Sequence, residues 1–238
     1  MRIDNLHNAE QARSVQAMFR RIAPHYDLMN RLMTGGQDLA WRKMVIHWAS
    51  IPPHGRVLDL GAGTGDLARE ALRQKPECEV IAADFTLQMM LVGKQQHGGI
   101  QSWSGADALN LPFPDNTFDA LISGFLLRNV VDLQQALKEQ YRVLKPGGRL
   151  VALDTTRPKP SLFSPFIRFH MRQVIPFLGG LLTGSRDAYV YLPSTSENFL
   201  WAEDLKTKIL AAGFEQALFK RLMFGTIAIH RAKKPAQG

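Results

Sequence analysis

Short apolar runs alternate with amphipathic segments between residues 56 and 155. The apolar runs have the length of strands and are bounded by turn residues: RVLDL, EVIAAD, IQSWSGAD, FDALISGF and GGRLVALDTT. The segments between them carry apolar residues at helical spacing: DLAREALRQ, LQMMLVGKQQ and DLQQALKEQYRVL. This alternation predicts an α/β fold, because parallel strands are joined by crossover helices. The run VIAA is apolar throughout, which favours a sheet covered by helices on both faces.

The residues before this region predict a helical cap. Residues 9–33 place apolar side chains at helical spacing around Pro24, which predicts a helix, a turn and a second short helix. Residues 38–49 repeat the amphipathic pattern, with Asp38 available as an N-cap. We interpret residues 1–52 as a cap on a larger domain.

The residues after this region depart from the alternation. Residues 158–190 mix large apolar side chains with arginines and predict a helical insertion or a lid. A helix at about 201–212 follows, and two β-like runs joined at Gly225 predict a hairpin added to the parallel sheet. We expect residues 1–238 to form a single domain.

Composition narrows the class of protein without choosing a function. The 238 residues are 45% hydrophobic and 21% charged, as in an ordinary globular domain. A net charge of +8 is compatible with nucleic acid, an anionic membrane surface or an acidic substrate. The single Cys78 excludes an internal disulfide, and no Cys/His cluster has metal-ligand spacing. No leader and no apolar run of roughly 18 residues is present, so we expect a cytoplasmic, metal-free protein.

Three glycines follow the first predicted strand in VLDLGAGTG. Gly61, Gly63 and Gly65 leave no Cβ where a ligand must lie against the turn, and the helix that begins at Asp66 offers unpaired N–H groups. Asp84 ends the next strand, nineteen residues after Gly65, where a nucleotide-binding βαβ unit places the carboxylate that accepts the ribose hydroxyls. The alternative is a tight turn with glycines for packing only. The two features together favour a nucleoside ligand.

The glycine spacing favours S-adenosylmethionine over a dinucleotide. G-x-G-x-G differs from the dinucleotide pattern G-x-G-x-x-G, and Asp59 stands two residues before the first glycine, where it would repel a pyrophosphate. An amino-acid tail fits better, since its ammonium can approach Asp59 while its carboxylate meets backbone N–H groups. Asp107 and Ala108 follow the third strand and could meet the adenine, although a solvated loop explains that stretch almost as well.

The order of these motifs resembles class I S-adenosylmethionine-dependent methyltransferases over about residues 55–155. The segments that carry this resemblance are VLDLGAGTGDLA, the acid at 84, LPFPDNTFD and YRVLKPGGRL. The flanking segments are similar to the menaquinone/ubiquinone biosynthesis C-methyltransferase family: MFRRIAPHYDLMNRLMT (18–34), LLRNVVD (126–132) and YLPSTS with AGFE and GTIAIHR near the end. The resemblance implies a Rossmann-like, seven-stranded sheet with one antiparallel strand, and methylation of a ring carbon of a polyprenylated benzoquinol or naphthoquinol.

Motif and resemblance together give a set of candidate site residues. The candidate cofactor-binding residues are Asp59, Gly61, Gly63, Thr64, Gly65, Asp84, Phe85, Asp107, Ala108 and Gly124. The candidate catalytic residues are Arg128 and Asn129, which would orient the quinol oxygen and stabilise a phenolate, and Tyr26, which would close over the cofactor. A strand-ending salt bridge and a turn Asn are the structural alternative for the first two, and packing is the alternative for Tyr26. The base is either a side chain or a bound water.

Three departures from the family pattern concern the acceptor. Leu126 stands where the family has glycine, LDTTRP with Asp154 and Arg157 replaces L-E-F-S-K-P, and Glu197 displaces an expected arginine. These changes leave methyl transfer intact but leave open the ring type, the tail length and the acceptor itself.

The expected partners follow from the acceptor. A lipophilic quinol would suit an apolar tunnel or an interfacial helix at 158–190. The arginines of this segment would favour the inner face of a membrane. An ordinary core or homodimer contact is the alternative.

Three rival functions stay open: methylation of a soluble small molecule, methylation of RNA, and a non-catalytic scaffold. Lysines and arginines are scattered rather than clustered with aromatics, so we expect no nucleic-acid partner.

Overall fold

The computed structural model describes residues 13–96, 99–100, 102–159 and 199–236, together with single positions at 165, 169, 173, 174 and 177. The expected insertion or lid at 158–190 therefore lies largely outside the described residues, as does Glu197.

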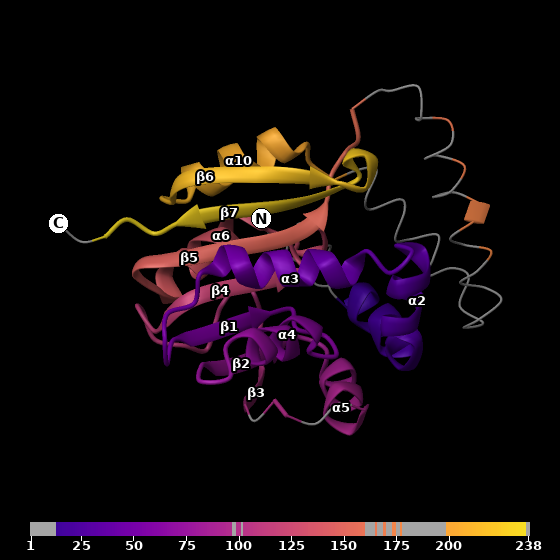
Figure 1. Cartoon of the computed structure of the whole chain (residues 1–238), viewed down its shortest axis with the longest axis horizontal. Coiled ribbons are helices and arrows are strands. Elements are labelled where there is room, and N and C mark those ends of the chain that lie inside the picture. The colour runs from indigo at the N-terminus through magenta and orange to yellow at the C-terminus, as the bar shows by residue number, and fades with distance from the viewer. Residues whose placement is uncertain are drawn as a thin grey trace, which may run out of the picture.

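Seven strands form one sheet in the order β3-β2-β1-β4-β5-β7-β6 (Figure 1). They are β1 (Arg56–Leu60), β2 (Glu79–Asp84), β3 (Ser102–Gly105), β4 (Phe118–Gly124), β5 (Leu144–Thr155), β6 (Glu215–Leu222) and β7 (Ile227–Lys233). β7 runs antiparallel to β5 and β6, whereas the other neighbouring pairs are parallel. The 3-10 turn η4 (Met223–Gly225) joins β6 to β7. This arrangement confirms the predicted parallel sheet with a C-terminal hairpin.

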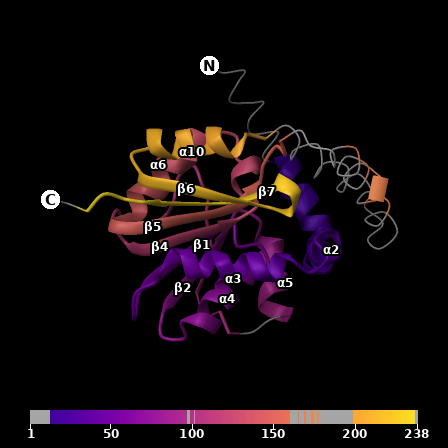
Figure 2. The ribbon, with the colours of Figure 1, turned by 45° about the horizontal axis from the view of Figure 1, so that its top comes forward.

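Helices cover both faces of the sheet (Figure 2). The described helices are α2 (Tyr26–Met33), α3 (Asp38–Ala49), α4 (Asp66–Gln74), α5 (Leu87–Gln96), α6 (Leu133–Val143) and α10 (Ala202–Ala211), with 3-10 turns η1 (Ala23–His25) and η2 (Leu127–Asn129). α3 and α4 share one buried cluster with strand residues such as Val57, and α6 and α10 share a second cluster with residues such as Leu58. Alternate strand residues thus enter two apolar cores, as a sheet buried on both faces requires.

The N-terminal segment forms the helices that its periodicity predicts. Residues 13–22 are helical, η1 contains Pro24, and α2 and α3 follow. Asp38 is the first residue of α3 and makes no N-cap hydrogen bond, so its predicted capping role is wrong. Its buried carboxylate instead accepts a hydrogen bond from Thr34 Oγ1 at 3.2 Å and pairs with Arg42 at 3.3 Å.

The sheet order places a site at the ends of β1, β2 and β4. β1 pairs with β2 on one side and with β4 on the other, so the direction of the crossovers reverses at β1. Open α/β sheets bind ligands at the carboxyl ends of the strands beside such a reversal. The glycine turn that follows Leu60 lies at that position.

Candidate active site

A cavity of about 160 Å³ opens at these strand ends. Strand ends and the loops that follow them contribute Leu60, Gly61, Gly63, Asp84, Phe85, Thr86, Ala106, Asp107, Ala108, Leu109, Gly124, Phe125, Leu126, Asn129, Val130 and Val131. The cap and α5 contribute Val15, Gln16, Phe19, Tyr26 and Met89. The structure therefore brings together residues from five separate stretches of the chain. Seven of the ten predicted cofactor-binding residues lie among them: Gly61, Gly63, Asp84, Phe85, Asp107, Ala108 and Gly124.

The glycine turn presents bare backbone to this cavity. Gly61 and Gly63 have φ values of +69° and +59°, which favour glycine. A Cβ on Gly61 would lie 2.9 Å from Leu126 Cδ1, and one on Gly63 would lie 3.1 Å from Met89 Cε. A side chain at either position would press on Leu126 or Met89 and take up space in the cavity that both glycines line.

Asp84 is a buried carboxylate that closes the turn. Its Oδ2 accepts a hydrogen bond from the Gly63 N–H at 2.8 Å, and its Oδ1 accepts one from the Thr86 N–H at 2.6 Å. Burial raises the pKa of Asp84, while these N–H donors act in the opposite direction. Asp84 also lines the cavity, so a ligand bound there would meet its carboxylate.

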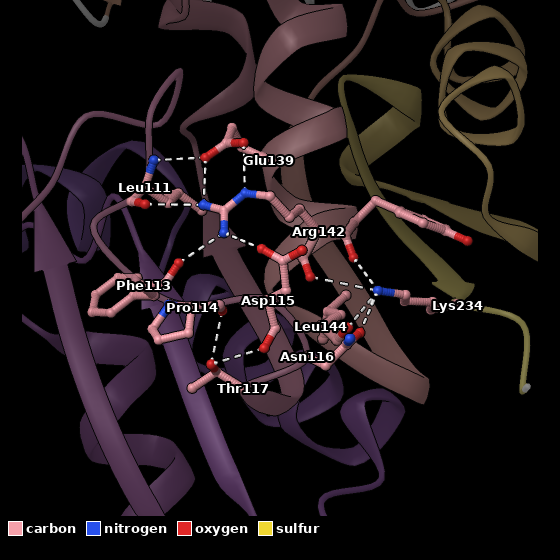
Figure 3. A network of polar contacts seen from close by, with 11 residues as sticks. Leu111, Phe113, Pro114, Asp115, Asn116, Thr117, Glu139, Arg142, Leu144 and Lys234 are labelled. Atoms are coloured by element: carbon pink, nitrogen blue, oxygen red, sulfur yellow. Dashed lines mark hydrogen bonds and ion pairs between the residues drawn. The ribbon is translucent and has the colours of Figure 1, made fainter.

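Helix α6 holds the loop that carries Asp107 and Ala108. Gln135 Nε2 donates to Leu109 O at 3.1 Å, and Glu139 Oε2 accepts from the Leu111 N–H at 2.8 Å. Arg142 donates to the carbonyl oxygens of Leu111 and Phe113 at 3.0 and 2.8 Å and pairs with Asp115 and Glu139 (Figure 3). The backbone at Leu109, Leu111 and Phe113 is therefore held from outside the cavity, whereas Asp107 is exposed and lines the cavity.

Three predicted cofactor-binding residues do not line the cavity. Asp59 is 1% exposed, and its Oδ2 accepts from the Ala68 N–H at 2.9 Å, so it anchors the first turn of α4. Burial raises the pKa of Asp59 to about 7. Thr64 Oγ1 donates to Asp27 Oδ1 at 2.7 Å. A Cβ on Gly65 would lie 2.5 Å from Ile100 Cδ1, which makes Gly65 a packing residue.

Arg128 is the predicted catalytic residue that the structure places outside the cavity lining. Its guanidinium forms a buried ion pair with Asp154 at 2.9 Å and faces the Phe125 ring at 5.0 Å. The Arg128 N–H donates to the same carboxylate at 3.3 Å. The salt bridge at the strand ends, given above as the structural alternative, is the observed arrangement.

The other two predicted catalytic residues line the cavity. Asn129 Nδ2 donates to Phe125 O at 2.9 Å, and its Oδ1 has no hydrogen-bond partner among the described residues. Phe125 has a φ of +60°, a strained value for a non-glycine residue that often marks functional sites. Burial raises the pKa of the Tyr26 hydroxyl, against the hydrogen bond with Asn30 and the positive charge of Arg128. The hydroxyl therefore keeps its proton at neutral pH.

Sequence reasoning missed the contribution of the helix at 13–22. Gln16 Nε2 donates to Phe85 O at 2.9 Å, and Phe19 packs edge-on against Tyr26 with the ring centroids 5.9 Å apart. The helical spacing of Phe19 indicates a buried face but not which part of the sheet that face meets. Leu126, noted as a departure from the family pattern, also lines the cavity beside Gly61.

No helix formed by the described residues is long and apolar enough to cross a membrane. Within those residues, no group of three or more His, Cys, Asp or Glu side chains is arranged to hold a metal ion.

The model of the ubiE/COQ5 methyltransferase family matches residues 6–234. The chain belongs to this family. Ubiquinone/menaquinone biosynthesis C-methyltransferase UbiE of Desulfotalea psychrophila is 46% identical over 217 residues, which cover 91% of this chain and 88% of that protein. Demethylmenaquinone methyltransferase of Thermus thermophilus is 44% identical over 221 residues, which cover 92% of this chain and all of that protein. These relatives confirm the resemblance stated from the motifs.

Solved structures show the fold that this methyltransferase shares with more distant proteins. The [4+2]-cyclase SpnF has a TM-score of 0.68 at 19% identity, covering 94% of this chain and 96% of its own. Human N-acetylserotonin methyltransferase, solved with S-adenosylmethionine, has a TM-score of 0.61 at 19% identity, covering 88% of this chain and 55% of its own. These likenesses confirm the predicted class I methyltransferase fold, and they carry nothing about the acceptor because one of the two proteins is named a cyclase.

Proposed function

We propose that this methyltransferase uses S-adenosylmethionine to methylate a ring carbon of a polyprenylated quinol, demethylmenaquinol or a related benzoquinol. The observation that carries the proposal is the meeting of Gly61, Gly63, Asp84 and the Asp107 loop around one cavity at the reversal of the sheet. The names of the relatives, which specify demethylmenaquinone and ubiquinone/menaquinone biosynthesis, support the acceptor class.

The residues present fit S-adenosylmethionine. The cradle at Gly61 and Gly63, which a Cβ would fill, suits an amino-acid tail lying on backbone. Asp84 would accept the ribose hydroxyls, and the loop at Asp107 and Ala108 would meet the adenine. Asp59 would hold α4 rather than touch the cofactor, because its carboxylate faces the Ala68 N–H and lies outside the cavity lining. When bound, the cofactor supplies an electrophilic methyl group on a positively charged sulfur.

Tyr26 and Asn129 would orient the acceptor. The protonated Tyr26 hydroxyl can donate a hydrogen bond to a quinol oxygen, and the unpartnered Oδ1 of Asn129 can accept one from a quinol hydroxyl. Arg128 would act through position, because it fixes the segment that carries Asn129 by pairing with Asp154. Holding the acceptor carbon in line with the methyl group contributes on the order of 7 kcal/mol or more to such transfers.

Exposed leucines on α2, which begins with the cavity residue Tyr26, and at the start of α5 suit a lipophilic acceptor. Leu28 and Leu32 lie one turn apart on α2, and their side chains are 54% and 45% exposed. Leu87, at the start of α5, follows the cavity residues Phe85 and Thr86 and is also exposed. A prenyl tail or the surface of a membrane would cover such side chains favourably. Peripheral contact with a membrane is therefore part of the proposal.

The proposal is tested by acceptor selection. The purified chain is incubated with S-adenosylmethionine carrying a labelled methyl group and, separately, with demethylmenaquinol, prenylated benzoquinols, soluble phenols and tRNA. Label on a ring carbon of a prenylated quinol is the expected result. Label only on a soluble phenol or on tRNA, or no transfer to any acceptor, would contradict the proposed acceptor.

A further inference from the structure

Thr64 points away from the cavity although its neighbour lines it. Gly63 faces the cavity, whereas Thr64 is 2% exposed and its Oγ1 donates to Asp27 Oδ1 at 2.7 Å. Asp27 in turn follows Tyr26, which lines the cavity from the cap. This hydrogen bond therefore joins two walls of the cavity. Its donor, Thr64, follows the lining residue Gly63, and its acceptor, Asp27, follows the lining residue Tyr26.

The backbone of Thr64 is held firmly, so its hydroxyl has a fixed direction. Arg69 Nη1 donates to Thr64 O at 2.7 Å, and α5 packs directly on Thr64, since a Cβ on Gly93 would lie 2.4 Å from that same oxygen. The glycine turn on the other side is tied to Asp84 through the Gly63 N–H. The Thr64 hydroxyl therefore has a fixed position relative to the turn, so a ligand that holds the turn in place also holds the donor to Asp27.

Asp27 of α2 lies beside a charged network that connects α2 with α3 and α4. Arg69 lies 4.0 Å from Asp27 and also pairs with Asp66. Asp66 pairs in turn with Arg42 of α3. Burial and the nearby Asp66 raise the pKa of Asp27, while the Thr64 hydroxyl and the arginines stabilise its charged form. The Thr64 hydrogen bond therefore stabilises a carboxylate that is costly to bury.

The apolar contact between cap and α5 is small. Among the described residues, the buried cluster there consists of Ala23, Met89 and Val92, with Phe19 and Tyr26 packed against it. The two main cores lie elsewhere, on the faces of the sheet. Few of these apolar side chains join the Tyr26 end of α2 to α5, so a polar contact beside them adds to how firmly this end of α2 docks.

We propose that the Thr64–Asp27 hydrogen bond is a positioning contact that couples ligand binding at the glycine turn to docking of the cap that carries Tyr26. The Thr64 side chain then acts as a positioning group through Asp27. This inference rests on the proposed function, because the ligand at the turn is S-adenosylmethionine or its product, S-adenosylhomocysteine. Coupling is reciprocal. A firmly docked cap must therefore strengthen ligand binding at the turn, and ligand binding must in turn slow amide hydrogen exchange in the cap.

The experiment measures binding and cap protection in the same variants. Affinity for S-adenosylhomocysteine is measured by calorimetry, and amide hydrogen exchange of residues 26–33 is followed with and without it. Thr64→Val removes the hydroxyl at nearly constant volume, and Thr64→Ser restores a hydroxyl. We expect Thr64→Val to weaken binding about tenfold, within the range that coupled sites show, and to abolish the ligand-dependent protection of 26–33. Thr64→Ser is expected to restore both.

A double-mutant cycle separates coupling from two independent defects. Asp27→Ala is expected to weaken binding of S-adenosylhomocysteine by the same factor as Thr64→Val. The affinity of the double variant is expected to lie within about twofold of that of either single variant. Asp27→Leu also removes the acceptor oxygens, fills a similar volume and serves if Asp27→Ala does not fold. Thr207→Val is the matched control, because Thr207 is exposed on α10 and donates only to Glu203 O of its own helix at 3.1 Å.

Each outcome decides between the proposals. Additive losses in the double variant, or a Thr64→Val protein with wild-type affinity and wild-type protection of 26–33, would overturn the coupling while leaving the proposed function in place. A wild-type chain that folds but does not bind S-adenosylhomocysteine would overturn the proposed function and the coupling with it.

Discussion

Arg128 and Asp154 form a buried ion pair that joins η2 to the end of β5. The guanidinium Nη1 lies 2.9 Å from Asp154 Oδ1, and the two side chains are 6% and 1% exposed. The Thr155 N–H also donates to Asp154 Oδ1 at 2.8 Å. Removing one partner of such a pair leaves the other charge buried without compensation, which costs more than the pair contributes to stability.

Asp154→Ala is therefore expected to lower the free energy of unfolding by about 3 kcal/mol, because it strands the Arg128 charge. The double variant Arg128→Met/Asp154→Leu, which removes both charges, is expected to lose less than Asp154→Ala alone. Urea unfolding of the three proteins measures these differences. If the double variant loses as much stability as Asp154→Ala or more, the ion pair is not the unit that we describe.

Asp84→Ala is expected to weaken binding of S-adenosylmethionine at least tenfold, since hydrogen bonds to a charged group are worth roughly 1.5–3 kcal/mol each. It removes the proposed ribose acceptor and also frees the Gly63 N–H of the turn. Calorimetry measures the affinity, with Asp204→Ala in the exposed first turn of α10 as the control. Unchanged affinity in Asp84→Ala would remove this carboxylate from the ribose site.

The elements of the fold could be predicted because each depends on residues close together in the chain. The period of apolar positions locates strands and helices, and the glycines of GAGTG mark the turn where β1 meets α4. Gly61 and Gly63 could be assigned to the cavity for the same local reason, since their backbone conformation requires glycine.

Side-chain directions could not be predicted, because they depend on partners far along the chain. Arg128 pairs with a residue 26 positions later, and Thr64 donates to one 37 positions earlier. The motif places both beside the cavity, but only packing decides that their polar atoms face other protein groups. Gly65 belongs to the same turn as Gly63, yet Ile100 and Trp103 make it a packing position.

His230 is expected to make stability depend on pH. It is 2% exposed on β7, and burial lowers its pKa to about 4 from an ordinary value of about 6.5. The unfolded chain therefore binds a proton more readily than the folded one. The stabilisation is complete above about pH 6.5 and is lost as the pH falls towards 4, by about 3 kcal/mol in total.

His230→Gln keeps a side-chain donor for Ala202 O, which His230 Nε2 contacts at 2.9 Å, but cannot titrate. Urea unfolding at pH 7, 6 and 5 is expected to show a smaller loss of stability with falling pH in this variant than in the wild type. Equal slopes in the two proteins would show that folding does not shift the pKa of His230.

Gln140 is expected to destabilise the protein as it stands. Its side chain on α6 is fully buried, and neither Oε1 nor Nε2 has a hydrogen-bond partner among the described residues. A buried polar group without a partner costs about 1–3 kcal/mol, so Gln140→Met, which is similar in volume and apolar, is expected to raise the free energy of unfolding by about 1 kcal/mol. Gln135→Met on the same helix is the matched control, because it removes the hydrogen bond to Leu109 O and is expected to lower stability. Urea unfolding measures both, and a loss of stability in Gln140→Met would show that its amide is satisfied by groups such as buried water.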